Sequence, residues 1–292
     1  MKNYVPKIAA IHDISGIGRC SMTVILPVMS ALGCQVCPLP TALLSNHSEY
    51  SDFYFYDFTE HMEEYYRNWE KNNAEFDCVY SGFIGSRKQI DIILDIINKI
   101  RANNKKKDTL IVVDPVMGDH GVTYKTYTDE MVEKMSHLVE KADIITPNFT
   151  EACILIGENY TSESISIKSV KRILKNLSDL GPRIVVMTGI KTDDGEYINA
   201  CYDNCSNEYY KVPFEFIKSR YPGTGDLFTS IFVGHLMNEM ELPKAIEEAS
   251  RFVTSSVSYT HNANTPSCEG VIFEKIMHEL YNKVTDYKYS II

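Results

Sequence analysis

The sequence predicts an α/β fold: a doubly wound, mostly parallel central sheet flanked by helices, with a small antiparallel hairpin at its edge. Short apolar runs alternate with amphipathic segments from residue 7 onward, which is typical of parallel strands joined by crossover helices. Polar and acidic residues follow many of these runs. Residues 196–214 differ, because two strand-like runs flank a short polar turn there, and this pattern indicates an antiparallel pair.

Each element follows from its local pattern. Continuous or alternating apolar runs predict strands at residues 7–12, 35–39, 76–80, 110–113, 143–146, 183–187, 197–202 and 208–212. Apolar residues at helical spacing predict helices over about residues 19–32, 59–69, 88–101, 127–140, 167–180 and 271–283, with further helices opening at Pro147, behind Gly225 and at Pro243. Residues 13–18 form a glycine-bearing turn, prolines break the strand at 35–39, and the aromatic, polar residues 46–56 suit an irregular flap.

Composition restricts the class of protein. The 292 residues are 44% hydrophobic and contain no linker or repeat, so we expect one domain over residues 1–292. The formal net charge of −10 argues against a nucleic-acid or acidic-membrane partner, and the only basic run, at residues 105–107, suits a solvated loop. The sequence shows neither a signal-peptide pattern nor a membrane-spanning run, and its eight cysteines suit a reduced core. We therefore expect a cytoplasmic protein.

The stretch most suggestive of chemistry is Gly223-Thr224-Gly225-Asp226, which leads into a buried helix. A curled glycine backbone at a helix start directs several N–H groups at one spot, and the helix dipole makes that spot suit an anion. Asp226 stands where it could accept a proton from a hydroxyl, although the dipole is expected to lower its pKa. An anion cradle beside a proton acceptor is what phosphoryl transfer to an alcohol requires. The alternative is a turn in which Asp226 merely caps its helix.

Polar residues at the carboxyl ends of the predicted strands support the first interpretation, because ligands of such sheets bind there. These residues are Asp13, Thr41, Ser81, Gly82, Asp114, Asp119, Thr146, Asn148, Glu151 and Thr188. A single one could be a helix cap, but capping does not require so many acids. Asp114, Asp119 and Glu151 together fit Mg²⁺ beside nucleotide phosphates. The sequence has no Walker motif and no Gly-x-Gly-x-x-Gly.

Several of these motifs resemble known families. Gly223-Thr-Gly-Asp226, with Pro147-Asn-Phe-Thr-Glu151, resembles the ribokinase-like superfamily. Within it, three stretches are similar to the pyridoxal kinase family: Leu44-Ser-Asn-His-Ser-Glu-Tyr50, Ser81-Gly-Phe-Ile-Gly-Ser86 and Asp114-Pro-Val-Met-Gly-Asp119. The resemblance extends over about residues 7–260. It implies ATP-dependent phosphorylation of the 5′-hydroxymethyl group of pyridoxal, pyridoxine or pyridoxamine by a homodimer that uses Mg²⁺, with a monovalent cation such as K⁺ as a further candidate cofactor.

The resemblance also implies roles for individual residues. Asp226 would be the base on the substrate hydroxyl, and Gly223, Thr224 and Gly225 would form the anion hole. The residues implied to contact the B6 vitamer are Asp13, Ser15, Thr41, His47, Phe83 and Asp226. Those implied to bind the nucleotide are Asp114, Thr146, Asn148, Glu151, Thr188, Lys211, Val212, Pro213 and Phe214, the last four near the adenine. Asp119 and Glu151 would hold the metal.

Two residues depart from the pattern of this family. Asp13 stands where members usually carry a serine, and Phe83 stands where a tyrosine is common. A carboxylate beside a pyridine favours the protonated ring, so we expect Asp13 to influence vitamer preference. Ser15, two residues on, could supply the missing hydroxyl, or Asp13 could only cap the following turn.

Three other functions stay open at this stage. Phosphorylation of 4-amino-5-hydroxymethyl-2-methylpyrimidine is a related activity, but its enzymes usually show a more glycine-rich first turn and lack the Ser-Asn-His run. A sugar kinase would commonly insert a β-lid after the first strand. A non-catalytic vitamer-binding protein would not need the full set of acids. An ATP-consumption assay with a panel of vitamers separates these functions.

Overall fold

The computed structural model describes residues 4–103, 109–124, 127–282 and 284–292. The basic run at 105–107 lies outside the described residues. The chain forms two compact units, one of residues 1–78 and 215–287 and the other of residues 79–214 and 288–292. The expectation of one domain stays a prediction.

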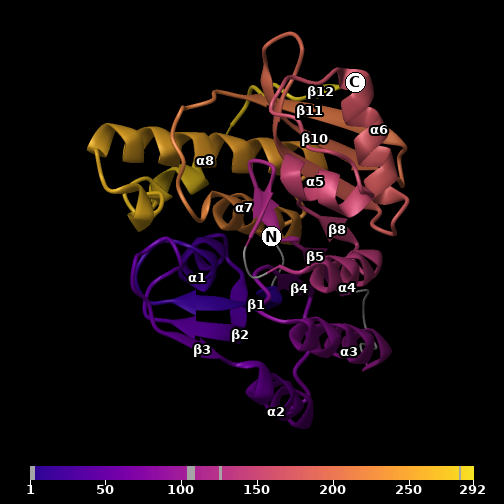
Figure 1. The fold of residues 1–292 in the computed structure, drawn as a ribbon, viewed down its shortest axis with the longest axis vertical. Coiled ribbons are helices and arrows are strands. Elements are labelled where there is room, and N and C mark those ends of the chain that lie inside the picture. The colour runs from indigo at the N-terminus through magenta and orange to yellow at the C-terminus, as the bar shows by residue number, and fades with distance from the viewer. Residues whose placement is uncertain (1–3, 104–108, 125–126, 283) are drawn as a thin grey trace. The chain divides into compact units, whose positions relative to one another are not determined.

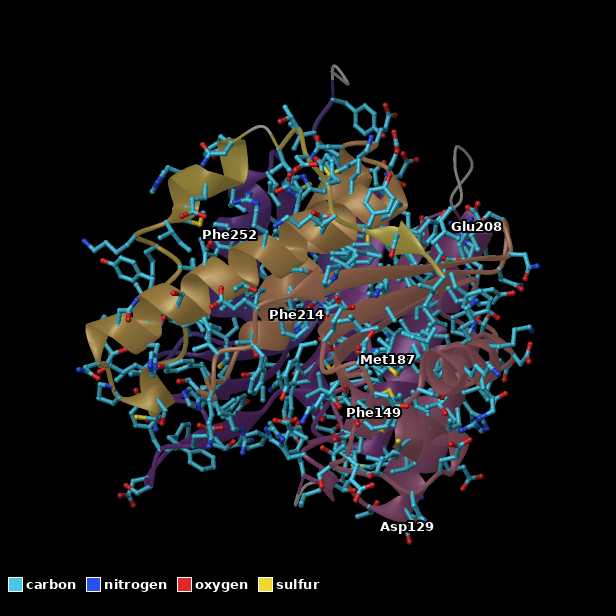
Figure 2. All side chains as sticks on the ribbon, turned by 90° about the horizontal axis from the view of Figure 1, so that it is seen from above. Asp129, Phe149, Met187, Glu208, Phe214 and Phe252 are labelled. Carbon is cyan, nitrogen blue, oxygen red and sulfur yellow. The ribbon has the colours of Figure 1, made fainter. Side chains whose placement is uncertain are left out.

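The first unit, which we call the N/C unit, combines the N-terminal residues 1–78 with residues 215–287 near the C-terminus (Figure 1). Its elements are β1 (Lys7–Ser15), α1 (Met22–Ala31), β2 (Gln35–Leu44), β3 (Phe55–Asp57), α2 (Thr59–Lys71), α7 (Thr224–Met237), α8 (Leu242–Ala263), η1 (Ser267–Glu269) and η2 (Met277–Tyr281). β1 pairs with β2 in parallel, and β2 pairs with β3 antiparallel. α1 packs on β1 and β2 and also on α7, which lies along α8. Phe232 of α7 and Phe252 of α8, the latter labelled in Figure 2, are fully buried in this core.

The second unit, the central unit, contains most of the predicted crossover pattern. Its elements are β4 (Cys78–Ser81), α3 (Arg87–Asn103), β5 (Leu110–Val113), β6 (Gly118–Asp119), β7 (Val122–Thr123), α4 (Asp129–Glu140), β8 (Ile144–Ile145), α5 (Phe149–Ile156), α6 (Ile167–Ser178), β9 (Ile184–Lys191), β10 (Tyr197–Asp203), β11 (Glu208–Phe214) and β12 (Ser290–Ile291). β5, β8 and β9 are parallel, whereas β9 to β12 are successively antiparallel. The predicted class is therefore confirmed: a mostly parallel sheet flanked by helices, with an antiparallel hairpin, β10–β11, toward one edge.

Two predicted strand ends were wrong. β1 continues through Asp13 to Ser15, so the glycine turn begins only at Gly16. β2 runs on through Pro38 and Pro40 to Leu44. Among the described residues β3 pairs only with residues 42–44 of β2. At both prolines β2 is therefore an edge strand, where the missing N–H costs no ladder bond.

One further prediction was partly right and another was wrong. The flap expected at residues 46–56 is irregular as far as Tyr54, but Phe55 and Tyr56 belong to the short strand β3, which pairs with β2. The helix expected over 271–283 is extended chain followed by the single 3-10 turn η2. Val271 and Phe273 are both buried two residues apart, which is the spacing of an extended chain rather than of a helix. The small hairpin β6–β7 was not predicted, because its strands have two residues each.

No helix among the described residues is long and apolar enough to cross a bilayer.

Candidate active site

The start of α7 is shaped by Gly223. This residue is the N-cap, with a positive φ of 80°, and a Cβ built on it would lie 2.0 Å from the carbonyl oxygen of Arg19. Only glycine fits there, because any side chain would clash with the turn that precedes α1. No side chain caps α7, so its first N–H groups can serve an anion, as the sequence predicted for Gly223, Thr224 and Gly225.

Asp226 is the third residue of α7, and the turn before α1 holds its carboxylate. Its Oδ2 accepts a hydrogen bond of 2.7 Å from the backbone N–H of Ser21, and its side chain is 13% exposed. Burial raises the pKa of Asp226 to about 6, with the charge of Asp13 adding to the rise and the Ser21 N–H opposing it. The expectation that the helix dipole would lower this pKa was wrong, because loss of water outweighs the dipole. A carboxylate with this pKa is well matched to accept a proton near neutrality.

Asp13 lies inside β1, at an irregularity in its pairing with β2. The register passes from His12 opposite Pro40 to Ile14 opposite Leu43, so Asp13 faces the two residues Thr41 and Ala42. Such a bulge re-aims side chains and is common beside active sites. The bulge brings Asp13 and Thr41, both buried, to one part of the sheet.

Ser15 bonds directly to Asp13. Its Oγ donates a hydrogen bond of 3.0 Å to Asp13 Oδ2, and both side chains are buried. Burial raises the pKa of Asp13, against hydrogen bonds from the side chains of Ser21 and Ser15. Ser15, which the sequence suggested as the source of the missing hydroxyl, is thus a hydrogen-bond partner of Asp13.

His47 packs against the glycine turn. A Cβ on Gly18 would meet the His47 ring at 2.2 Å. Nε2 of His47 lies 2.5 Å from the carbonyl oxygen of Cys268, and its Nδ1 accepts a bond of 3.3 Å from the N–H of Glu49. These partners assign the ring proton to Nε2. The predicted contact of His47 with substrate stays a prediction, since both ring nitrogens already bind backbone.

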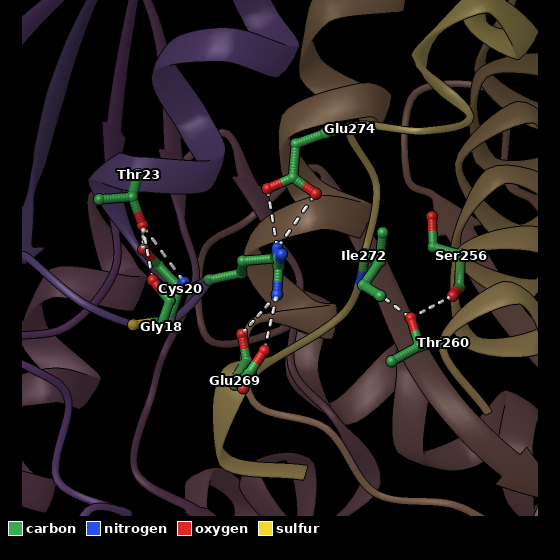
Figure 3. Close-up of polar contacts among 9 residues, drawn as sticks. Gly18, Cys20, Thr23, Ser256, Thr260, Glu269, Ile272 and Glu274 are labelled. Carbon is green, nitrogen blue, oxygen red and sulfur yellow. Dashed lines mark hydrogen bonds and ion pairs between the residues drawn. The ribbon is translucent and has the colours of Figure 1, made fainter. Parts of the chain in front are cut away.

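The chain after α8 holds the same turn in place (Figure 3). Arg19 Nε lies 2.7 and 3.0 Å from the two carboxylate oxygens of Glu274, and its Nη1 donates to the carbonyl oxygen of Glu269 at 3.1 Å. Thr260 of α8 accepts the N–H of Ile272 at 2.8 Å, which fixes the next part of this segment. The backbone of Arg19, which packs on Gly223, is therefore anchored from its side-chain end.

Sequence reasoning missed three residues of this site: His12, Cys20 and Ser21. His12 is fully buried, and its Nδ1 lies 4.0 Å from Asp226 Oδ1. Burial raises the pKa of the Cys20 thiol, and the charges of Asp13 and Asp226 add to the rise. The helix was predicted over about residues 19–32, so Ser21 lay inside it and the sequence did not mark it as the N-cap that the structure shows.

In the central unit, Glu151 completes a capping box at the start of α5. Its Oε2 accepts the N–H of Asn148 at 2.8 Å, and the Asn148 side chain accepts the N–H of Glu151 at 2.9 Å. The other oxygen, Oε1, accepts the N–H of Met117 at 3.2 Å. Burial nevertheless raises the pKa of Glu151, and the nearby charge of Asp119 adds to the rise. Capping therefore explains why Glu151 is there, while its buried charge leaves it suited to a cation.

The hairpin β6–β7, which carries Asp119, is tied to the same helix start. The Asn148 amide donates to the Gly118 carbonyl oxygen at 2.9 Å, and the Thr150 hydroxyl accepts the N–H of Gly121 at 2.9 Å. Asp119 itself is 31% exposed and lies 3.6 Å from His120 Nε2.

Asp114 and Glu151 lie near the same tyrosine. Asp114, just beyond β5, donates its N–H to the Ser81 carbonyl oxygen at 2.9 Å. Burial raises the pKa of Tyr127, and the charges of Glu151 and Asp114 add to the rise.

The acids of the central unit fit Mg²⁺ by their chemistry. In the part of the chain that the structure describes, no group of three or more His, Cys, Asp or Glu side chains is arranged to hold a metal. Mg²⁺ beside phosphates usually takes only one or two protein carboxylates, the rest being water and phosphate oxygens. Asp119 and Glu151, close enough for their charges to interact, match that donor set.

The other predicted nucleotide residues also belong to the central unit. Asn148 and Thr188 form a parallel bridge, in which Thr188 N–H donates to the Pro147 carbonyl oxygen at 3.0 Å. Thr146 is buried and donates its N–H to the Val113 carbonyl oxygen at 3.2 Å. The predicted adenine stretch is the end of β11, where Lys211 Nζ pairs with Glu196 at 2.7 Å, Val212 is buried, and Pro213 and Phe214 are partly exposed. Phe83 is half-buried in the segment after β4.

The structure thus gathers the predicted residues into two groups. The N/C unit brings together the alcohol-binding and catalytic candidates Asp13, Ser15, Thr41, His47, Gly223, Thr224, Gly225 and Asp226. The central unit contains Phe83, Asp114, Asp119, Thr146, Asn148, Glu151, Thr188, Lys211, Val212, Pro213 and Phe214. The roles of the individual residues stay predictions.

The mostly parallel α/β sheet flanked by helices is the fold of the ribokinase-like kinases. The model of the phosphomethylpyrimidine kinase family matches residues 27–269. The chain therefore belongs to the phosphomethylpyrimidine kinase family.

Individual relatives of this chain include pyridoxal kinases as well as a protein assigned to the phosphomethylpyrimidine kinases. A protein of Bacteroides thetaiotaomicron assigned to the phosphomethylpyrimidine kinases, and crystallised with pyridoxal, is 41% identical, with a TM-score of 0.93 over 99% of this chain and 100% of that chain. A pyridoxal kinase of Histophilus somni is 28% identical over 243 residues, which are 80% of this chain and 82% of that protein. The pyridoxal kinase of Leishmania donovani, solved with ADP and pyridoxamine, shares the fold with a TM-score of 0.88 at 22% identity, over 98% of this chain and 99% of that chain.

Proposed function

We propose that this protein is an ATP-dependent kinase that phosphorylates the 5′-hydroxymethyl group of pyridoxal, pyridoxine or pyridoxamine. The observation that carries the proposal is Asp226, which is buried at the start of an uncapped, glycine-started helix and held by Ser21. The arrangement supplies a proton acceptor beside a cluster of N–H donors. The relative at 41% identity that was crystallised with pyridoxal supports the same class of acceptor.

The chemistry follows from this geometry. Asp226 accepts the proton of the substrate hydroxyl while the hydroxyl oxygen attacks the γ-phosphorus of ATP. The first N–H groups of α7 stabilise charge on the transferring phosphoryl group. Asp13, with Ser15, binds near the pyridine nitrogen and favours its protonated form. Asp119 and Glu151 would hold Mg²⁺, and Asp114, Thr146, Asn148 and Thr188 would surround the nucleotide phosphates. A bound Mg²⁺ neutralises charge on the phosphates.

The direct test is an ATP-consumption assay with purified protein and each of the three vitamers, with the phosphorylated product identified by mass. We expect ATP use that depends on a vitamer and yields its 5′-phosphate. Omitting Mg²⁺, and replacing K⁺ by a large organic cation, tests the two cations in the same assay. Binding of all three vitamers without turnover would instead indicate a non-catalytic vitamer-binding protein.

A second candidate acceptor is 4-amino-5-hydroxymethyl-2-methylpyrimidine, because the matching family model is that of phosphomethylpyrimidine kinases. This alcohol also carries a hydroxymethyl group on a nitrogen heterocycle. The ratio of kcat/KM for the pyrimidine and for pyridoxal decides between the two. A ratio above one would make the pyrimidine the principal substrate.

We also propose that the protein is a homodimer. β3 is the last strand in its sheet order, and Phe53, Tyr54, Phe55 and Tyr56 in and before it are all 40% exposed or more. An exposed aromatic edge of this kind is typical of a contact between chains. Sedimentation should give the mass of a dimer, and Phe55→Glu should shift it toward the monomer, whereas Val122→Glu, at the exposed β7, should not. A monomeric parent would contradict the proposal.

A cytoplasmic location is the natural setting for this activity. All eight cysteines are free, and five of them are buried. Free thiols in this number suit a reducing compartment. Fractionation of the source cells with an antibody tests the location directly.

A further inference from the structure

Ser21 has a backbone conformation that serine rarely adopts. Its φ is 47° and its ψ is −131°, and it is 6% exposed at the N-cap position of α1. Serine at an N-cap normally accepts a hydrogen bond from the helix it precedes, but the Ser21 side chain makes no such bond. A left-handed conformation in a residue with a Cβ persists only where the surroundings impose it.

The backbone N–H and the side chain of Ser21 face two acids that lie outside α1. Its backbone N–H donates to Asp226 Oδ2 at 2.7 Å. Its side chain lies close enough to Asp13 to oppose the rise in the pKa of that carboxyl. One residue thus lies beside both Asp13 and Asp226, which come from β1 and from α7. With this positive φ, the N–H of Ser21 is directed at Asp226 while its side chain lies near Asp13.

The other titratable groups around Asp226 do not supply a positive charge. His12 of β1 has its pKa lowered to about 3 by burial, so it is neutral at pH 7. The Cys20 thiol, in the turn before α1, is also neutral, because burial raises its pKa. Asp13 contributes a like charge that raises the pKa of Asp226. Ser21 is therefore the donor that stands between two buried carboxyl groups that otherwise repel each other.

We infer that Ser21 is a positioning residue for phosphoryl transfer: its N–H fixes the accepting carboxylate of Asp226, and its hydroxyl fixes Asp13 toward the substrate ring. The inference rests on the proposed function. With Oδ2 held by Ser21, the hydroxyl proton passes to Oδ1 of Asp226. The substrate oxygen forms a bond to the γ-phosphorus as the bond to the bridging oxygen breaks, which leaves ADP, the phosphorylated alcohol and a protonated Asp226.

Two substitutions separate the two roles of Ser21. Ser21→Thr keeps the hydroxyl, but its β-branched side chain opposes a positive φ, so it disturbs the N–H that holds Asp226. Ser21→Gly permits the same φ and keeps the N–H, but it has no hydroxyl for Asp13. Ser21→Ala is the intermediate variant, without the hydroxyl and with a Cβ.

The two variants should change different properties: Ser21→Thr the rate and its pH dependence, and Ser21→Gly the ranking of vitamers. Ser21→Thr should lower kcat by about 10- to 100-fold through misplacement of the base. It should also move the acid limb of the kcat–pH profile to higher pH, because the N–H that lowers the pKa of Asp226 is lost. Its ranking of vitamers by kcat/KM should stay that of the parent. Ser21→Gly should keep kcat within about threefold and an acid limb no higher than the parent's, while its vitamer ranking changes.

The inference would be overturned if kcat fell equally in both variants while the acid limb and the vitamer ranking stayed those of the parent. It would also be overturned if both variants behaved like the parent. Thermal unfolding and the KM for ATP check that each variant is folded. If Ser21→Thr does not fold, Ser21→Ala and Ser21→Gly still test the hydroxyl, since an unchanged vitamer ranking in both would refute its role. Asp226→Asn in the same assays separates this inference from the proposed function. Retained activity there refutes the base itself, whereas lost activity there with parental Ser21 variants refutes only the role of Ser21.

Discussion

Asp226 and Glu151 occupy the same position in two helices, the third residue of α7 and of α5. Glu151 accepts the N–H of Asn148, its own N-cap, in a reciprocal capping box. Asp226 follows a glycine N-cap with no capping side chain, and it accepts its hydrogen bond from Ser21 in a different element. Both carboxyl groups have raised pKa values because both are buried.

The difference teaches how to separate a structural acid from a chemical one. The position of Glu151 is explained by the helix that it caps, whatever else it binds. Asp226 caps no backbone group of its own helix start, and a buried carboxylate that is not explained by capping requires another explanation. The two acids should therefore respond differently when each loses its charge without changing its size.

The largest expected effect is that of Asp226→Asn. The amide cannot accept the hydroxyl proton, so kcat should fall roughly 10²–10⁴-fold, as for loss of a general base. The KM for ATP and the thermal unfolding temperature should change little, since the substitution removes a buried charge and breaks no cap. Steady-state kinetics with pyridoxal measure the effect. A kcat within threefold of the parent would refute the role of Asp226.

Glu151→Gln should act on the metal. The Gln carbonyl oxygen can still accept the N–H of Asn148, so the cap largely persists while the charge is lost. The Mg²⁺ concentration for half-maximal rate should rise by about 10- to 100-fold, which is typical for loss of a group that holds or orients a metal. A Mg²⁺ titration at saturating ATP measures this. An unchanged titration would mean that Glu151 is only a cap.

Asn148→Ala is the matched control for Glu151→Gln. It removes the other half of the capping box and keeps the carboxylate, so it should lower the free energy of unfolding by about 1 kcal/mol. Its Mg²⁺ titration should shift less than that of Glu151→Gln. Equal shifts in the two variants would assign the effect to the helix start and not to the charge.

The sequence predicted the class of fold and most element positions, because apolar periodicity and helix-start residues are local signals. It could not predict that β2 continues through Pro38 and Pro40, because this depends on how the strands pair. Among the described residues β3 pairs only with residues 42–44 of β2, which leaves both prolines at an edge. It singled out Asp13 and Asp226 as site candidates by residue type and position, and their roles stay predictions. It missed Ser21, because neither a positive φ nor a bond across some 200 residues leaves a pattern in the sequence. The raised pKa of Asp226 could not be predicted either, because it results from burial in the folded chain.

Asp13→Ser should have a smaller and more selective effect. It restores the residue type usual in pyridoxal kinases and removes a carboxylate that favours a protonated pyridine by roughly 1–3 pKa units. We expect the ratio of kcat/KM between pyridoxamine and pyridoxal to fall by about tenfold, because pyridoxamine carries a second cationic group. Measurement of all three vitamers at two pH values decides the point. If the three values change together, Asp13 supports the scaffold and does not contact the ring.

The smallest expected effect is on the pH profile, and it tests the coupling between Asp13 and Asp226. Asp226 accepts a proton only when it is ionised, so kcat should fall as the pH drops through about 6, the value to which burial and the charge of Asp13 raise its pKa. Asp13→Asn keeps the shape of the side chain and removes that charge. The pKa of Asp226 should then fall, and the acid limb of kcat should move to lower pH, by about one unit or less because burial remains the larger cause.

Glu151 supplies the comparison within the same experiment. Glu151→Gln should leave the acid limb where it is, because burial, Asp13 and Ser21 are what set the pKa of Asp226. The kcat–pH profile between pH 4.5 and 8, recorded at saturating Mg²⁺ for both variants, measures the two shifts together. An acid limb that stays in place or rises in Asp13→Asn would show that the carboxylate of Asp13 does not act on Asp226. An equal shift in both variants would show that the limb does not belong to Asp226. Only a downward shift confined to Asp13→Asn fits an Asp226 whose pKa is raised by the charge of Asp13.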